Sequence, residues 1–210
     1  MPAASSREVS TIRRRLLPIA VRIPFGVSAH HVHLSQADCE QLFGVGHRLS
    51  VAHPISQPGQ FAAMERVELV GPRASIAHVG IVGPVRAESQ VELARTDAVH
   101  LGIQPPVRES GRLAGTPGLT LRGPAGEVTL KQGVIVAQRH IHMGPEEARR
   151  FRLENGERVR VRVAGARPVI FEDVVVRVRD DFALELHLDT DEANAAGVDA
   201  NATAWLELDR

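Results

Sequence analysis

The sequence predicts a mainly β protein with short helices, organised as two β-barrel domains. Short runs of β-type residues fill most of the chain, and glycine–proline pairs typical of turns separate them at residues 71–72, 83–84 and 123–124. A strand–helix–strand pattern also occurs twice. At 210 residues the chain is long enough for one large domain or for two domains of about 100 residues each.

The first third of the chain is expected to form one strand, one helix and a loop. Residues 19–28 have strand-like composition. Ser35 stands three residues before Asp38, a spacing typical of a helix N-cap, and the predicted helix runs to Phe43. Residues 50–64 are rich in turn-forming residues and are expected to be a loop.

The rest of the chain is expected to alternate strands with two further helices. One helix begins at Gly144-Pro145, because proline is favoured in the first turn. The other begins near Asp189-Thr190 and ends before Gly197. The strands are expected at residues 65–70, 75–82, 90–94, 118–122, 127–130, 133–139, 158–163, 169–178, 182–188 and 203–208.

Both copies of the repeated pattern begin with paired histidines. The segments His31-Val32-His33-Leu34 and His140-Ile141-His142-Met143 are each followed, four and eight residues on, by an acidic residue and a large apolar residue. Each copy then leads through a glycine-containing turn toward another strand. The repeat predicts that each copy seeds its own barrel.

The paired histidines indicate metal binding. In a strand, side chains at i and i+2 leave the same face, so His31 and His33, or His140 and His142, can reach one ion. On a helix the same spacing would direct the rings apart. One His-x-His pair arises easily by chance, and most single histidines are ordinary surface or core residues. Two pairs with similar flanking sequences favour two metal sites, each with two of its ligands supplied by a His-x-His pair.

Each pair needs a further ligand. Glu92 shares strand parity with the polar Gln90, and His187 lies on the opposite strand face from three leucines. Both are candidates for a third ligand, although ordinary solvent-facing residues have the same spacing. The histidines without such partners are expected to be non-ligands: His47, His53, His78 and His100.

Charge, cysteine content and hydropathy indicate which partners and which cell compartment suit the protein. The 25 basic and 25 acidic residues give no net charge, which argues against nucleic acid as the main partner. Cys39 is the sole cysteine, so a disulfide framework is excluded and a reducing, intracellular compartment fits. No apolar run reaches the roughly 18 residues of a membrane span. Arg86 follows a turn shortly before Glu92 and is either an anion ligand suited to phosphate or a surface arginine.

Residues 1–18 differ in character from the rest of the chain. Apolar residues fall near helical spacing with Arg13, Arg14 and Arg15 between them, but the continuous apolar segment of a secretory signal is missing. The segment is expected to be a solvated terminus or, alternatively, a short amphipathic docking helix.

Six longer motifs extend from about Ile19 almost to the C-terminus. They are Val27-Ser28-Ala29-x-His31-Val32-His33-Leu34-Ser35, Ser56-Gln57-Pro58-Gly59-Gln60-Phe61, Gln90-Val91-Glu92-x-x-Arg95-Thr96-Asp97, Pro106-Val107-Arg108-Glu109-Ser110-Gly111, Arg139-His140-Ile141-His142-Met143 and His187-x-Asp189-Thr190-Asp191-Glu192-Ala193-Asn194. With these motifs the chain resembles the PduL-type phosphate propanoyltransferases, which are phosphotransacylases associated with bacterial microcompartments.

The resemblance implies two β-barrels with a dinuclear metal site at their interface. One barrel would comprise residues 19–29 and 138–210, and the other residues 30–137, with residues 1–18 as an N-terminal extension that serves as an encapsulation peptide. It also implies a homodimer in the cytoplasm, inside a bacterial microcompartment, with shell or core proteins as partners.

The resemblance also assigns roles by motif. Two zinc ions per chain would be held, one by His31, His33 and Glu92, and the other by His140, His142 and His187. Arg86 would bind phosphate. Coenzyme A would lie along Val27, Ser28, Ala29, Arg73 and Asn194. The chain departs from the family pattern at three positions: His30 replaces a usual arginine, Gly80 a basic residue and Arg73 a lysine.

The implied function is that of a phosphate acyltransferase. It would convert a short-chain acyl-CoA, such as propanoyl-CoA or acetyl-CoA, and phosphate into acyl phosphate and CoA by direct transfer. A dinuclear metallohydrolase acting on thioesters or phosphoesters is a second hypothesis, which phosphate-dependent product formation would separate from the first. A non-catalytic metal-binding protein of the microcompartment is a third.

Overall fold

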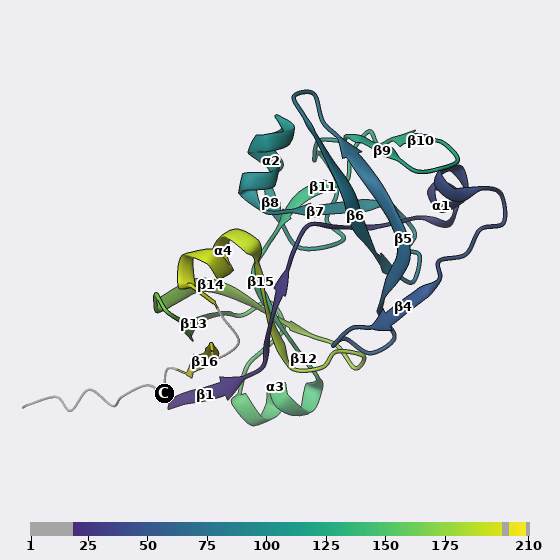
Figure 1. Cartoon of the computed structure of the whole chain (residues 1–210). Coiled ribbons are helices and arrows are strands. Elements are labelled where there is room, and N and C mark those ends of the chain that lie inside the picture. Colours follow the sequence, from purple (N-terminus) through teal and green to yellow (C-terminus); the bar gives the residue numbers. More distant parts are fainter. Residues whose placement is uncertain (1–18, 199–201, 209–210) are drawn as a thin grey trace, which may run out of the picture.

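The computed structural model describes residues 19–198 and 202–208, and it is mainly β (Figure 1). The described part of the chain contains four short helices: α1 (Gln36–Phe43), α2 (Arg95–Leu101), α3 (Pro145–Phe151) and α4 (Thr190–Ala196). No helix in these residues is long and apolar enough to cross a membrane. The predicted N-terminal extension, residues 1–18, lies outside the described residues.

A seven-stranded sheet forms a nearly closed barrel. Its spatial order is β1 (Ile19–Ile23), β16 (Thr203–Leu208), β13 (Arg158–Ala164), β14 (Val169–Val178), β12 (His140–Met143), β15 (Glu185–Asp189) and β2 (Phe25–Ser28). The edge strands β1 and β2 are separated in the chain by Pro24 alone, so the sheet curls back on itself, although these two strands do not pair with each other. The single strand predicted over residues 19–28 is therefore two strands, because proline cannot donate to a strand ladder.

A nine-stranded sheet forms a half-barrel. Its order is β10 (Glu127–Thr129), β9 (Thr120–Arg122), β5 (Phe61–Val70), β6 (Ser75–Gly83), β3 (His31–His33), β7 (Gln90–Leu93), β11 (Val134–Ala137) and β8 (Val107–Arg108), with β4 (Val51–Pro54) paired to β5. The chain crosses from the first sheet to the second between β2 and β3, as the purple segment shows (Figure 1). The expected pair of barrels is thus one nearly closed barrel and one half-barrel.

Each sheet buries its own apolar core, and this fixes the direction of the histidines. Ile141 and Met143 of β12 are fully buried in the core of the barrel, and Val32 of β3 is fully buried in the core of the half-barrel. Because side chains alternate between the two faces of a strand, the histidines beside these residues point away from the cores. One copy of the repeated His-x-His pattern lies in each sheet.

Helix α1 begins as predicted, whereas α2 was not predicted. The Ser35 hydroxyl accepts a hydrogen bond from the Asp38 amide at 3.1 Å and caps α1. The N-cap of α2 is Ala94, whose side chain cannot accept a hydrogen bond, and Asp97 instead reaches back to the Ala94 amide at 3.2 Å. The sequence before α2 therefore lacks the N-cap side chain by which a helix start is usually predicted.

The loop predicted over residues 50–64 was wrong in its extent, because only residues 55–60 lack a strand between β4 and β5. Strand β4 occupies Val51–Pro54, and β5 begins at Phe61. All four side chains of β4 are exposed, so the strand lacks the apolar alternation by which a half-buried strand is recognised.

Candidate metal centre

The first ligand group combines two residues of β3 with one residue of β7. The two strands are antiparallel, and His31 lies directly opposite Glu92. The Nε2 atoms of His31 and His33 are 3.2 Å apart. The carboxylate oxygens of Glu92 lie 3.7 Å from each of these nitrogens. Each residue thus offers a ligand atom within 4.8 Å of the other two, which is close enough for a single ion.

The hydrogen bonds of this group set the histidine tautomers. Nδ1 of His31 donates to the carbonyl of Ala29 at 2.9 Å, and Nδ1 of His33 donates to the carbonyl of Val82 at 3.0 Å. Each neutral ring then carries its lone pair on Nε2. Two lone pairs facing each other at 3.2 Å repel, and a cation between them removes the repulsion. This arrangement fits metal-binding histidines, which typically donate their other ring nitrogen to a carbonyl.

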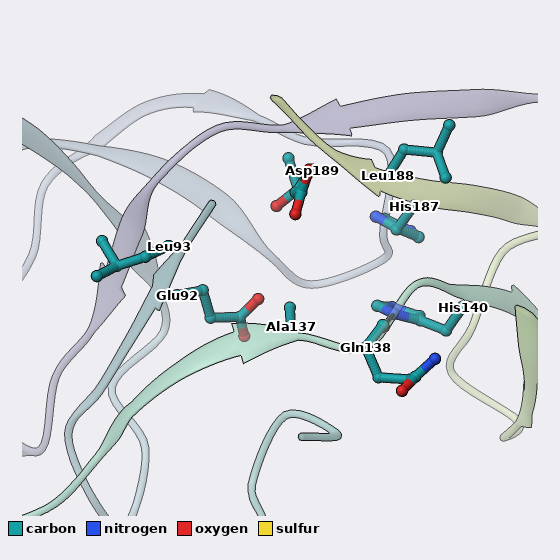
Figure 2. Close-up of a pocket in the computed structure, with 9 residues that line it drawn as sticks. Glu92, Leu93, Ala137, Gln138, His140, His187, Leu188 and Asp189 are labelled. Atoms are coloured by element: carbon teal, nitrogen blue, oxygen red, sulfur yellow. Dashed lines mark hydrogen bonds between the residues drawn. The ribbon is translucent and has the colours of Figure 1, made fainter. Parts of the chain in front are cut away.

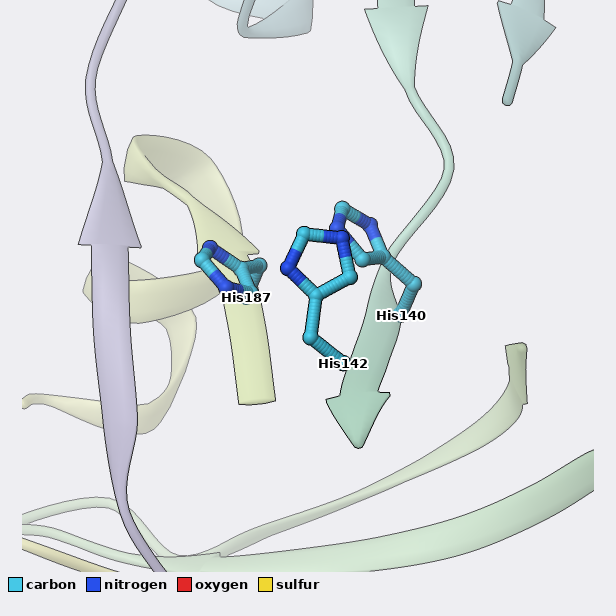
Figure 3. Close-up of side chains that lie close together, drawn as sticks. All are labelled: His140, His142 and His187. Carbon is cyan, nitrogen blue, oxygen red and sulfur yellow. The ribbon is translucent and has the colours of Figure 1, made fainter. Parts of the chain in front are cut away.

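The second ligand group combines two residues of β12 with one residue of β15. His140 lies directly opposite His187 across these antiparallel strands, and the rings of His140, His142 and His187 converge (Figure 3). Nδ1 of His140 donates to the carbonyl of Gln138 at 2.7 Å, which again leaves Nε2 free. The ligand atoms of this group also lie within 4.8 Å of one another.

Unpartnered nitrogens show that the three-histidine group suits a metal. Both ring nitrogens of His142 are buried and have no hydrogen-bond partner among the described residues. Leaving such an atom unsatisfied costs about 1–3 kcal/mol. Nε2 of His187 lies 3.1 Å from a carboxylate oxygen of Glu185 and likewise has no hydrogen-bond partner among the described residues. A metal ion would bind the lone-pair nitrogen of His142 and so satisfy that atom.

The protonation states also match metal ligation. Burial lowers the pKa of His33 and of His140 to about 3, and neighbouring histidines add to the effect. Burial, with His140 and His187 nearby, also lowers the pKa of His142. Burial alone would raise the pKa of Glu92, but His31 and His33 outweigh it, and the pKa of Glu92 falls below its usual value. At neutral pH these imidazoles are neutral and Glu92 is ionised, which are the forms that bind metals.

Both ligand groups border one pocket of about 540 Å³ that is lined by residues of both sheets. The side chains of Glu92, His140 and His187 also line a second, small cavity of about 20 Å³ together with Asp189 (Figure 2). Glu92 belongs to the half-barrel, and the two histidines belong to the barrel. The two groups therefore face a common space between the sheets.

Three arginines line the pocket beside the two groups. Arg86, predicted from the sequence, donates to the Ser110 hydroxyl at 3.1 Å. Arg177 lies directly opposite His142 across β14 and β12, and Arg179 is held by a two-pronged ion pair with Asp181. Sequence reasoning missed Arg177, which lies in β14, and Arg179, one residue beyond its end, although their i, i+2 spacing is the same as in the His-x-His pairs.

The structure brings together only part of the predicted coenzyme A contacts. Val27, Ser28 and Ala29 line the pocket, whereas the side chains of Arg73 and Asn194 are exposed and lie outside its lining.

Two of the three positions that depart from the family pattern, His30 and Gly80, lie close to the first ligand group. Gly80 is directly opposite His31 in the parallel pair β3–β6, so this neighbour of His31 carries no basic side chain. Nδ1 of His30 lies 3.2 Å from Asp97.

The histidines outside the two ligand groups differ in their surroundings. His47 pairs with Glu65 at 2.8 Å. His53 lines the pocket although it was expected to be a non-ligand, but it belongs to neither ligand group. His78 and His100 are exposed.

Comparison with known proteins gives a consistent result. The family profile described as phosphate propanoyltransferase matches residues 24–199. The phosphate propanoyltransferase of Thermotoga maritima is 52% identical over 191 residues, which covers 90% of this chain and 89% of the relative. Those of Salmonella typhimurium and Levilactobacillus brevis are each 51% identical, over 201 residues (95% of both chains) and 181 residues (86% of both chains). The comparisons confirm the family resemblance that the six motifs predict.

Proposed function

We propose a two-metal mechanism of acyl transfer for this chain, which belongs to the phosphate propanoyltransferase family and is an acyltransferase that acts on phosphate and acyl-CoA. In the proposed reaction a short-chain acyl-CoA, propanoyl-CoA or acetyl-CoA, passes its acyl group directly to phosphate. The observation that carries the proposal is that two groups of three potential metal ligands border one pocket together with Arg86.

Two zinc ions are proposed to bind, one at each group. His31, His33 and Glu92 would hold one ion, and His140, His142 and His187 the other. Three protein ligands leave a coordination position open for substrate. Zinc bound there supplies Lewis acidity, which polarises the thioester carbonyl and stabilises a thiolate.

Arg86 is proposed to bind and orient phosphate. Its guanidinium lines the pocket, and Arg177 and Arg179 add positive charge near it. A phosphate oxygen held there attacks the thioester carbonyl carbon; a carbon–oxygen bond forms, the carbon–sulfur bond breaks, and CoA leaves as the thiolate. Fixing phosphate beside the carbonyl removes the entropic cost of bringing the reactants together. Enclosure of the pocket between two sheets limits hydrolysis of the thioester by water.

Coenzyme A is proposed to enter along β2. This strand is an edge of the barrel that pairs only with β15, so the backbone groups of Val27 and Ser28 on its other side, and of Ala29 just after the strand, can bond to a ligand. Arg73 and Asn194 are exposed and lie outside the pocket, and they would contact the outer part of the cofactor. His30 and Gly80 alter the surroundings of this path relative to the family pattern.

Further proposals follow from the family resemblance. Residues 19–29 and 138–210 would form one domain and residues 30–137 the other, which is compatible with the division of strands between the two sheets. The chain would form a homodimer in the cytoplasm, inside a bacterial microcompartment, guided there by residues 1–18 and in contact with shell or core proteins.

Free-thiol release tests the proposed reaction. Propanoyl-CoA and acetyl-CoA are incubated with the enzyme, with and without phosphate and before and after removal of metal by a chelator. Direct transfer requires both phosphate and metal for thiol release. Release without phosphate would identify a hydrolase, and no release from folded, zinc-loaded protein would identify a structural metal protein.

A further inference from the structure

Glu185 is a buried carboxylate next to the three-histidine group. It lies on β15 two residues before His187, so the two side chains leave the same face of the strand. Its side chain is largely buried, with the residue 9% exposed. Oε2 of Glu185 is 3.1 Å from Nε2 of His187, accepts a hydrogen bond from Nε2 of Gln57 at 3.1 Å and accepts another from the Ser56 hydroxyl. One carboxylate oxygen therefore joins His187 to a segment far away in the sequence.

That segment is the loop of residues 55–60, which connects β4 and β5 of the half-barrel and lines the pocket. Gln57 is 2% exposed, although its side chain is polar. Its amide forms a two-way contact with Ala183 of the barrel: Nε2 donates to the carbonyl and Oε1 accepts from the backbone N–H, each at 3.2 Å. Through Gln57, the loop of the half-barrel is thus hydrogen-bonded to Ala183 and Glu185 of the barrel.

The neighbouring strand leaves space for this carboxylate. Gly26 of β2 lies directly opposite His187. A Cβ atom at Gly26 would stand 3.1 Å from Oε1 of Glu185, closer than most real Cβ contacts. Glycine at this position therefore lets Glu185 lie against β2 while its other oxygen faces His187 and the loop.

We propose that Glu185 is a positioning residue that couples the orientation of His187 to closure of loop 55–60 over the pocket. With the metal on Nδ1 of His187, the Nε2–H of the ring can donate to Oε2 of Glu185, and a carboxylate in this position fixes the ring and raises its basicity. Because the same oxygen also holds Ser56 and Gln57, metal bound by His187 favours the closed loop, and the closed loop favours metal binding. Such coupling is reciprocal by thermodynamic linkage. The inference rests on the proposed metal at the three-histidine group.

Zinc titration of the chelated full-length protein tests the coupling. Glu185→Gln is expected to weaken zinc binding at the three-histidine group by about 10-fold. Ser56→Ala removes only one hydrogen bond from an exposed loop residue that touches no proposed ligand, and it is expected to weaken zinc binding by about threefold. Glu207→Gln is the matched control, since Glu207 is a similarly buried carboxylate of the same sheet that pairs with Arg162 away from the pocket.

Amide hydrogen exchange of loop 55–60 supplies the second readout. Zinc is expected to slow exchange of the loop in the wild type and in Glu207→Gln, but not in Glu185→Gln. The coupling would be overturned if Glu185→Gln and Ser56→Ala bind zinc within about twofold of the wild-type affinity. It would also be overturned if zinc does not change amide exchange of the loop in the wild type. If the wild type takes up no zinc at the three-histidine group, the proposed metal site itself fails, which is a separate outcome.

Discussion

The ring of His140 stacks on the ring of His187 across the antiparallel strands β12 and β15, with centroids 4.9 Å apart and planes 9° from parallel. The other sheet repeats this arrangement, because His31 lies opposite Glu92 across β3 and β7. Each His-x-His strand also has a parallel neighbour on its other side, β14 beside β12 and β6 beside β3. Two sheets thus build the two halves of the candidate centre with the same local strand order.

Removing the three-histidine group should abolish acyl transfer. His142→Ala deletes two buried ring nitrogens that lack a hydrogen-bond partner among the described residues, and it should lower kcat by about 1000-fold, the effect of losing several kcal/mol of Lewis-acid stabilisation. Steady-state thiol release measures the loss. His100→Ala, at an exposed histidine of α2, is the control. Retention of wild-type kcat by His142→Ala would refute the proposed role.

Arg86→Lys should weaken the use of phosphate more than the use of acyl-CoA. Lysine keeps the charge but lacks the planar fork that binds two phosphate oxygens. Because a hydrogen bond to a charged group contributes about 1.5–3 kcal/mol, kcat/KM for phosphate should fall about 10- to 150-fold, while KM for acyl-CoA stays within a few-fold. Arg158→Ala, on an exposed arginine of β13, should change neither constant. Equal losses for both substrates would count against a phosphate-specific role.

The metal-free protein should lose stability in acid. The pKa values of His33 and His140 are lowered to about 3 by burial, from an ordinary value of 6.5. Between these values the unfolded chain binds protons that the folded chain does not bind, so stability falls as pH drops from about 6.5 toward about 3 and is fully present above that window.

Thermal melts of chelated protein across this pH range measure the effect. His140→Gln removes one of the histidines whose pKa is lowered, so melting temperature should depend less on pH in this variant. A melting temperature that does not change between pH 7 and pH 4 would contradict the expectation.

The core beneath the histidines should carry much of the stability. Leu186 is fully buried on β15 between Glu185 and His187, and Leu186→Ala should cost about 2–5 kcal/mol in urea unfolding. Ile170 on β14 is 47% exposed, so Ile170→Ala should cost less than about 0.5 kcal/mol. An equal loss of unfolding free energy in the two variants would show that burial on the core face does not determine the stability of these strands.

The sequence was most informative where side-chain alternation decides the outcome. His31 and His33 were expected on one strand face because Val32 between them is apolar, and strand parity selected Glu92 and His187 as candidate third ligands. The structure brings these side chains into two groups of potential ligands. Parity was sufficient because a core residue between two histidines fixes the direction of both.

Sequence reasoning failed where structure depends on tertiary contacts. Helix α2 has Ala94 at its N-cap, so the usual local signal was absent, and the exposed strand β4 has no apolar alternation. Arg177 was not recognised as a pocket residue because its position depends on the pairing of β14 with β12. Strand pairing between distant segments is not encoded in a local pattern, and neither is the contact of Gln57 with Glu185 across the two sheets.

Zinc add-back to the chelated enzyme tests the two-metal proposal most directly. Bound zinc and phosphate-dependent thiol release from propanoyl-CoA are measured together as zinc is added. The proposal predicts two zinc ions bound per chain, activity that requires both groups to be filled, and one zinc ion bound by each of the inactive double variants His31→Ala/His33→Ala and His140→Ala/His142→Ala. Full activity in the zinc-free protein, or in either double variant, would contradict it.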